Sequence, residues 1–131
     1  MIEPALRDGR FVLCDRFADA TLAYQGYGRG IDLTTLRALA HAATRGLEPD
    51  LTLLVDVSVE VSQARVAART QAGGGLADRL EREDGAFHER VRQGYLELAR
   101  SQARFVTIDG TQTAETVLRA ASQAVSAKLG M

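Results

Sequence analysis

An Asp-Arg pair at positions 15 and 16 is the part of the sequence whose residue types could most directly carry chemistry. The pair follows the apolar run 11–14, which is typical of a buried strand. In a parallel α/β sheet, ligands gather at the carboxyl ends of the strands. There a carboxylate can organise a hydrated Mg²⁺ ion, and an arginine can hold a phosphate through two parallel hydrogen bonds. An ion pair that closes a strand end would have the same sequence, so both interpretations stay open at this point.

A second group of candidate residues surrounds the glycine-rich stretch 70–77. Gln71 is followed by an alanine and three glycines, which cannot hold a regular element without a large entropic cost. The sequence therefore predicts a mobile loop between two helices. Arginines stand on both sides of it: Arg65, Arg69, Arg79 and Arg82. A flexible segment flanked by cations could close over phosphates, and the alternative is an ordinary connection.

The elements that must position these residues alternate between strands and helices. Three near-continuously apolar runs, each followed at once by Asp, are typical of buried parallel strands: 11–14, 51–55 and 104–108. Four segments have apolar residues at helical spacing: 31–45, 59–69 after a capping Ser58, 86–100 and 114–128. This alternation predicts an α/β fold with a parallel sheet.

The composition narrows the class of protein. A chain of 131 residues with 46% hydrophobic and 25% charged residues is expected to form one globular domain, residues 1–131. A net charge of -1 argues against nucleic acid or an anionic membrane as the main partner. No apolar run approaches a membrane span and Met1 does not begin a signal peptide pattern, so we expect a cytoplasmic protein. The one cysteine, Cys14, excludes an internal disulfide and is expected to be buried.

Residues 15–30 read DRFADATLAYQGYGRG, and this stretch resembles the signature of bacterial thymidylate kinases. In that family, Asp-Arg and an aromatic residue lead to Ser, Thr or Asn, then to Ala-Tyr-Gln-Gly and a Gly-Arg-Gly turn. Residues 48–56 are similar to the fourth strand of the family, residues 78–81 to its lid motif, and residues 87–95 to the helix after the lid. Residues 2–6 resemble the end of the helix before the third strand, so the resemblance covers essentially the whole chain.

The resemblance implies a role for each polar residue of the signature. Arg16 would bind the phosphate of dTMP, and Asp15 would support the arrangement of metal and phosphate. Thr21 would hydrogen-bond the edge of thymine, and Gln25 would contact the nucleotide. Tyr24 would press on the deoxyribose where a 2′-hydroxyl would clash, although a core aromatic on a helix is the alternative.

For ATP, the resemblance points to a lid region at residues 69–82. Arg69 and Arg79 would neutralise charge on the transferred phosphoryl group, and Arg65 is a further candidate on the ATP side. Gln112 lies in a loop that is similar to the adenine-contacting loop of the family.

The chain contains no Gly-x-x-x-x-Gly-Lys-Ser/Thr phosphate loop, and its single lysine, Lys128, ends the last predicted helix. Gly26, Gly28 and Gly30 are expected to permit a tight turn rather than to cradle a phosphate. The resemblance therefore implies an incomplete, three-layer P-loop nucleoside monophosphate kinase fold that lacks the first two strands. Since the family's strand order is 2-3-1-4-5, the runs 11–14 and 51–55 would flank a missing strand and keep unpaired edges.

The main hypothesis is thus the dTMP-binding and lid part of a thymidylate kinase, inactive without the phosphate loop. Its ligands would be dTMP and ATP, its cofactor would be Mg²⁺, and the resemblance implies a homodimer. The alternative is a non-catalytic nucleotide-binding or assembly module derived from a P-loop kinase. A third possibility, a related kinase for another base, fits the signature at Thr21, Tyr24 and Gln25 less well.

Overall fold

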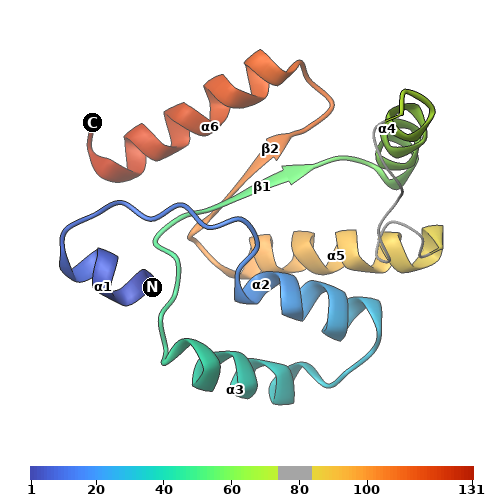
Figure 1. Cartoon of the computed structure of the whole chain (residues 1–131). Coiled ribbons are helices and arrows are strands. Elements are labelled where there is room, and N and C mark those ends of the chain that lie inside the picture. The colour runs from blue at the N-terminus through green and yellow to red at the C-terminus, as the bar shows by residue number, and fades with distance from the viewer. Residues whose placement is uncertain (74–83) are drawn as a thin grey trace.

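The computed structural model describes residues 1–73 and 84–131 (Figure 1). Helices and strands alternate along most of it, which confirms the predicted α/β class. The elements are, in chain order, α1 (Ile2–Arg7), α2 (Ala18–Thr21), the π-helix η1 (Leu22–Gly28), α3 (Leu33–Thr44), β1 (Thr52–Asp56), α4 (Val59–Gln71), α5 (Gly85–Ser101), β2 (Phe105–Asp109) and α6 (Ala114–Leu129).

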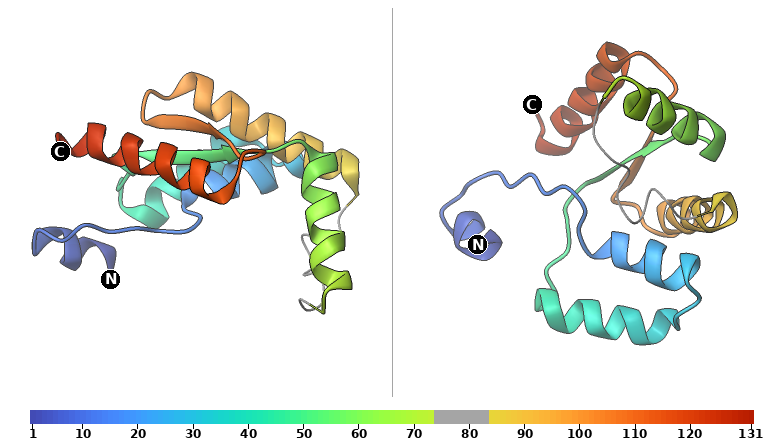
Figure 2. Two further views of the ribbon diagram at one scale, coloured as in Figure 1. Left: turned by 90° about the horizontal axis from the view of Figure 1, so that it is seen from above. Right: turned by 45° about the vertical axis from the view of Figure 1, so that its right-hand side comes forward.

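The two strands form a parallel pair, in register from Thr52 opposite Phe105 to Asp56 opposite Asp109. Parallel strands need a long crossover connection, and α4 and α5 lie in it. Helices α5 and α6 cover opposite faces of this pair in both views (Figures 1 and 2). The result is the predicted order of layers, helix on sheet on helix.

Side-chain caps set the beginnings of the helices. The Ser58 hydroxyl accepts a hydrogen bond from the amide of Val61 at 3.3 Å, which confirms the predicted cap of α4. The Asp84 carboxylate accepts one from the amide of Phe87 at 2.7 Å and so begins α5 one residue earlier than predicted. Asp32 and Thr113 cap α3 and α6 in the same way.

The core lies where η1 packs between α3 and α5. Leu22, Leu36 and Leu98 form one buried cluster, and Ala23, Phe87 and Val91 form another.

The expectation that Gly26, Gly28 and Gly30 make a tight turn holds only for Gly30, whose φ is 80°. Gly28 lies inside η1, where a Cβ atom would come within 2.8 Å of the Phe87 ring. Gly26 has the same restriction against Leu33, so these two glycines serve close helix packing.

The predicted strand at residues 11–14 is wrong. The segment has no strand conformation; Phe11 is 64% exposed, Leu13 is 86% exposed, and Cys14, expected to be buried, is exposed as well. A strand needs a neighbour to take its backbone hydrogen bonds, and within the described residues none lies beside this segment. The run is apolar, but the described sheet holds no partner strand that would bury it.

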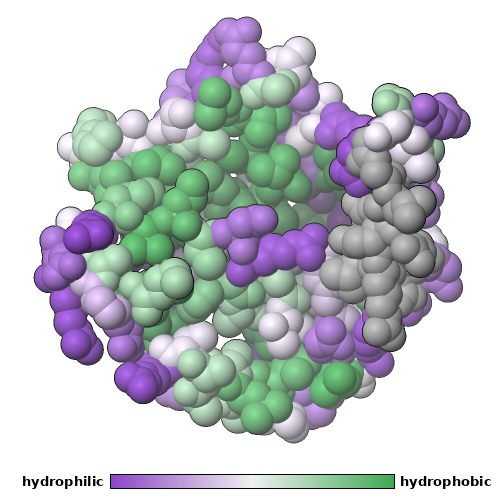
Figure 3. Space-filling model, in the orientation of Figure 1, coloured by the Kyte–Doolittle hydropathy of each residue, from purple (hydrophilic) through white to green (hydrophobic). Residues whose placement is uncertain are grey.

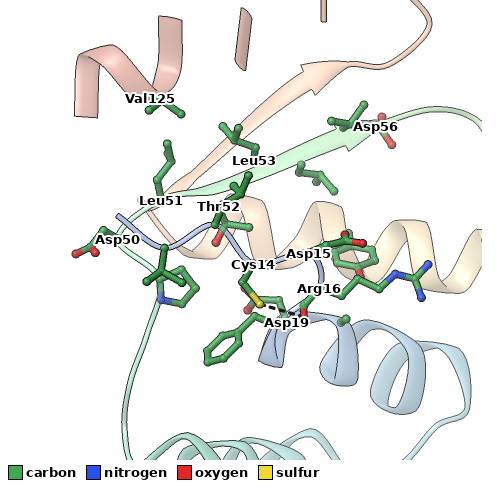
Figure 4. A pocket seen from close by; sticks show the side chains of 18 of the residues that line it. Cys14, Asp15, Arg16, Asp19, Asp50, Leu51, Thr52, Leu53, Asp56 and Val125 are labelled. Atoms are coloured by element: carbon green, nitrogen blue, oxygen red, sulfur yellow. Dashed lines mark hydrogen bonds between the residues drawn. The ribbon is translucent and has the colours of Figure 1, made fainter. Parts of the chain in front are cut away.

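An open groove of about 1480 Å³ separates residues 10–17 from β1 and α6. Hydrophobic side chains gather in the middle of this face (Figure 3). Leu51, Leu53 and Val125 line the groove on one side and Cys14 on the other (Figure 4). The predicted gap between the runs 11–14 and 51–55 is therefore present as a groove with apolar walls.

Most of the predicted lid, 69–82, lies outside the described residues, and so do Arg79 and Arg82. The predicted loop 70–77 began too early, because α4 continues through Gln71. None of the helices within residues 1–73 and 84–131 is long and apolar enough to cross a membrane.

Candidate functional site

Asp15 and Arg16 lie exposed at the end of the extended segment, just before α2 begins. They stand toward the end of the groove at which β1 finishes in Asp56 (Figure 4). In the described part of the chain, the two side chains form no ion pair with each other. Arg16 has a φ of 59°, a left-handed conformation that is uncommon for a residue with a side chain. Such strain persists only where the surroundings enforce it, and it is frequent at ligand sites.

The structure brings Arg16 together with Tyr24. The guanidinium carbon of Arg16 lies 5.3 Å from the centre of the Tyr24 ring, within the range of a cation–π contact. Gln25 and Tyr24 are half-buried on η1, while Thr21 is exposed at the end of α2. A π-helix is rare and often marks a functional site. Four of the predicted dTMP contacts therefore lie on one short stretch that begins at the groove.

Two aromatic side chains of α5 surround Tyr24, and sequence reasoning assigned neither of them to the site. The Tyr95 ring meets the Tyr24 ring edge-on, with centres 6.3 Å apart and planes at 83°. The centres of the Phe87 and Tyr24 rings lie 6.1 Å apart, and the angle between the ring planes is 57°. Burial raises the pKa of Tyr95 to about 12, with the nearby Tyr24 as a further cause. In the sequence, Tyr95 lies at helical spacing from Val91 and Leu98, and this pattern is typical of a core position as much as of a site.

A buried ion pair fixes α2 to the sheet. The Arg104 guanidinium donates two hydrogen bonds to the carboxylate of Asp19, both of 2.8 Å. It also donates to the hydroxyl of Thr52 at the start of β1. The Nε atom of Arg104 is buried and has no hydrogen-bond partner among the described residues. This contact joins residues 85 positions apart in the sequence, which is why no local pattern could predict it.

Comparison with known proteins shows the family of this chain. The sequence model for thymidylate kinase matches residues 1–121. The chain belongs to the thymidylate kinase family. It is 49% identical to a thymidylate kinase of Desulfovibrio desulfuricans, over 98% of this chain and 61% of that protein. A thymidylate kinase of Geotalea daltonii is 46% identical, over 98% of this chain and 62% of that protein. A thymidylate kinase of Carboxydothermus hydrogenoformans is 52% identical, over 88% of this chain and 54% of that protein.

The chain thus spans about three fifths of the length of the first two of these thymidylate kinases. Family membership and the parallel α/β layers confirm the predicted class, an incomplete P-loop nucleoside monophosphate kinase fold. The described sheet has two strands, and the apolar run 11–14 lies across the groove from β1 without pairing with it.

In this chain, each of the two described strands ends in an aspartate that has a partner. Arg92 donates two hydrogen bonds, of 2.9 and 3.0 Å, to the carboxylate of Asp56 at the end of β1. Hydrogen bonds from Gln112 and Thr111 lower the pKa of Asp109, at the end of β2, to about 2. The side-chain amide of Gln112, predicted to lie in an adenine-contacting loop, thus donates to Asp109 at 3.0 Å.

Of the three arginines predicted to act on ATP, the structure describes two. Arg65 and Arg69 are exposed on α4, and their spacing of four residues puts them on one side of that helix. Arg79 falls outside the described residues. For a metal ion, the described residues contain no group of three or more His, Cys, Asp or Glu side chains. A single exposed carboxylate such as that of Asp15 would suffice for Mg²⁺ only where substrate phosphates supply the other ligands.

Proposed function

We propose that this chain is the dTMP-binding and lid part of a thymidylate kinase, which transfers a phosphoryl group from ATP to dTMP and so serves dTTP biosynthesis. The observation that carries the proposal is the contact between Arg16 and Tyr24 beside the groove. A guanidinium can hold the phosphate through two parallel hydrogen bonds, and an aromatic face next to it offers a rigid surface for the sugar. A nucleoside monophosphate presents these two groups next to each other.

The backbone of Arg16 supports a binding role over a structural one. A left-handed backbone conformation costs free energy for a residue with a side chain such as Arg16, and a glycine or asparagine at this position would lower that cost. An exposed arginine in this conformation buries little area in return. We infer that the strain aims the guanidinium at the phosphate position.

Recognition of the base would fall to Thr21 and Gln25. A hydroxyl both donates and accepts hydrogen bonds, as does a carboxamide, so the two can match the pattern of a pyrimidine edge. Thr21 lies three residues before Tyr24 and so shares its side of the helix, whereas Gln25 directly follows Tyr24 and lies on another side. Of the described residues, Tyr24 lines the groove, and Thr21 and Gln25 do not.

On the ATP side, we propose Arg65, Arg69 and Arg79 as the cations of a lid at residues 69–82, with Gln112 beside the adenine. Asp15 would contribute to the site of Mg²⁺, which supplies charge neutralisation at the phosphates. A cytoplasmic location and a homodimer complete the proposal.

We further infer that these residues alone do not catalyse phosphoryl transfer, because the sequence has no phosphate loop to hold the ATP phosphates. The same absence favours a second candidate, a non-catalytic nucleotide-binding or assembly module. Reading the genomic sequence upstream of Met1 separates the two, because an in-frame Gly-rich loop with lysine supports the enzyme.

The experiment is calorimetric titration of dTMP into the chain, with Arg16→Ala compared to Arg119→Ala. Arg119 is a matched control, because it makes only an exposed ion pair with Glu115 along α6. Loss of a charge-assisted phosphate contact costs roughly 1.5 to 3 kcal/mol, so Arg16→Ala should weaken dTMP binding about ten- to more than a hundredfold. If Arg16→Ala only lowers the melting temperature and leaves dTMP affinity unchanged, Arg16 is a structural residue and the proposal fails.

A further inference from the structure

The ring of Tyr24 is held by one neighbour from the same stretch of sequence and by two from α5. Arg16 lies over its face, and Phe87 and Tyr95 of α5 contact it from two further directions. These contacts form because η1 and α5 approach very closely. At Gly94, a Cβ atom would come within 2.6 Å of Tyr27, so only glycine permits this approach without a shift.

The two aromatic neighbours differ in what else they do. Phe87 is 3% exposed and belongs to the core cluster with Ala23 and Val91, so its removal would damage the fold. Tyr95 is half-buried and lines the groove together with Asp15 and Arg16. Its raised pKa of about 12 means that the hydroxyl stays protonated and uncharged throughout the physiological range.

We propose that Tyr95 is a positioning residue that sets the selectivity of the site for deoxyribose over ribose, by preventing the Tyr24 ring from tilting. The inference rests on the proposed function and on the role that the family resemblance implies for Tyr24, which would occupy the space that a 2′-hydroxyl needs. The site can reject the 2′-hydroxyl of a ribonucleotide only if that hydroxyl collides with the Tyr24 ring. A Tyr24 ring that could tilt away would avoid the collision and would not discriminate.

The edge-to-face contact of Tyr95 is suited to this task. It blocks rotation of the Tyr24 ring toward α5, while Arg16 lies over the ring face. The ring of Tyr95, rather than its hydroxyl, makes this contact. Tyr95→Phe should therefore keep the selectivity, and Tyr95→Leu should lose it.

The experiment measures the dissociation constants of dTMP and of ribothymidine 5′-monophosphate for the chain and three variants. The variants are Tyr95→Leu, Tyr95→Phe and, as a matched control, Tyr27→Leu, which lies in the same helix interface but packs against the Leu22, Leu36 and Leu98 cluster. Tyr95→Leu should reduce the preference for dTMP by about two- to tenfold, the equivalent of one aromatic pair. Tyr95→Phe and Tyr27→Leu should keep the ratio of the two constants, whatever their effect on stability.

The possible results test the inference about Tyr95 separately from the proposed dTMP-binding function. If Tyr95→Leu weakens both ligands equally, or if Tyr27→Leu changes the ratio as much, Tyr95 is a packing residue and the inference is overturned while the proposed function stands. If the unsubstituted chain, folded by circular dichroism, binds neither nucleotide, both are overturned. A ratio that falls only in Tyr95→Leu supports the inference.

Discussion

Arg16 occupies the point at which the extended segment gives way to α2, and its left-handed backbone lies at this change of direction. The identity of the candidate residues around it could be predicted, because residue type and spacing are local properties of the sequence. Their geometry could not. The contact of Tyr24 with Tyr95 depends on how closely two distant helices approach, and that distance follows from Gly28 and Gly94 acting together.

Titration of the tyrosines tests this environment. The folded pKa of Tyr95 is raised from 10.0 to about 12, so its contribution to stability is fully present below pH 10 and is lost as the pH rises through about 12. Ultraviolet absorbance of tyrosinate should show one transition with a midpoint near 12, absent from Tyr95→Phe. A variant that keeps the late transition would show that Tyr95 is not the desolvated tyrosine.

Helix α2 is held to the sheet by the pair of Asp19 and Arg104, whose side chains are 9% and 15% exposed. Removing one partner of a buried pair leaves the other charge uncompensated, so Arg104→Ala should lower the free energy of unfolding by about 3 to 5 kcal/mol. Arg119→Ala, with its exposed pair, should change it by no more than about 0.5 kcal/mol. Urea unfolding measures both. Similar values for the two variants would mean that Arg104 does not fix α2.

Close packing of α5 against η1 gives a second prediction at the scale of elements. Gly94→Ala places a Cβ atom 2.6 Å from Tyr27 and should cost about 1 to 3 kcal/mol of stability. Gly85→Ala lies on the same helix with its nearest neighbour, Gln63, at 3.5 Å, and should be tolerated. Thermal unfolding distinguishes them, and equal melting temperatures would contradict the packing described here.

Most elements could be predicted, and the errors have physical causes. Strands at 51–55 and 104–108 and four of the helices are confirmed within one or two residues, since apolar periodicity and caps are local signals. The run 11–14 has the same apolar signal but lacks a partner strand, and pairing is not a local property. The ion pair of Asp19 with Arg104 was missed for the same reason.

At the scale of the whole molecule, the groove is lined by the candidate dTMP-binding residues, while the sequence contains no loop that would bind the ATP phosphates. Asp15, Arg16 and Tyr24 line the groove, and so does β1, whose second edge pairs with no strand of residues 1–73 and 84–131. Nothing in the sequence supplies the amides and lysine that hold ATP phosphates. The purified chain should therefore give no dTMP-dependent ATP turnover above blank, and dTDP formation at about 1 per second, the low end for kinases, would contradict this.

The central claim is that residues 15–25 form the dTMP site of this chain. Its most direct test is a titration of the isotopically labelled chain with dTMP, followed by amide resonances in nuclear magnetic resonance spectra. The account predicts saturable shifts concentrated at Arg16, Thr21, Tyr24 and Gln25, with small changes along α6. Shifts confined to other elements, or none at millimolar dTMP in a folded chain, would contradict it.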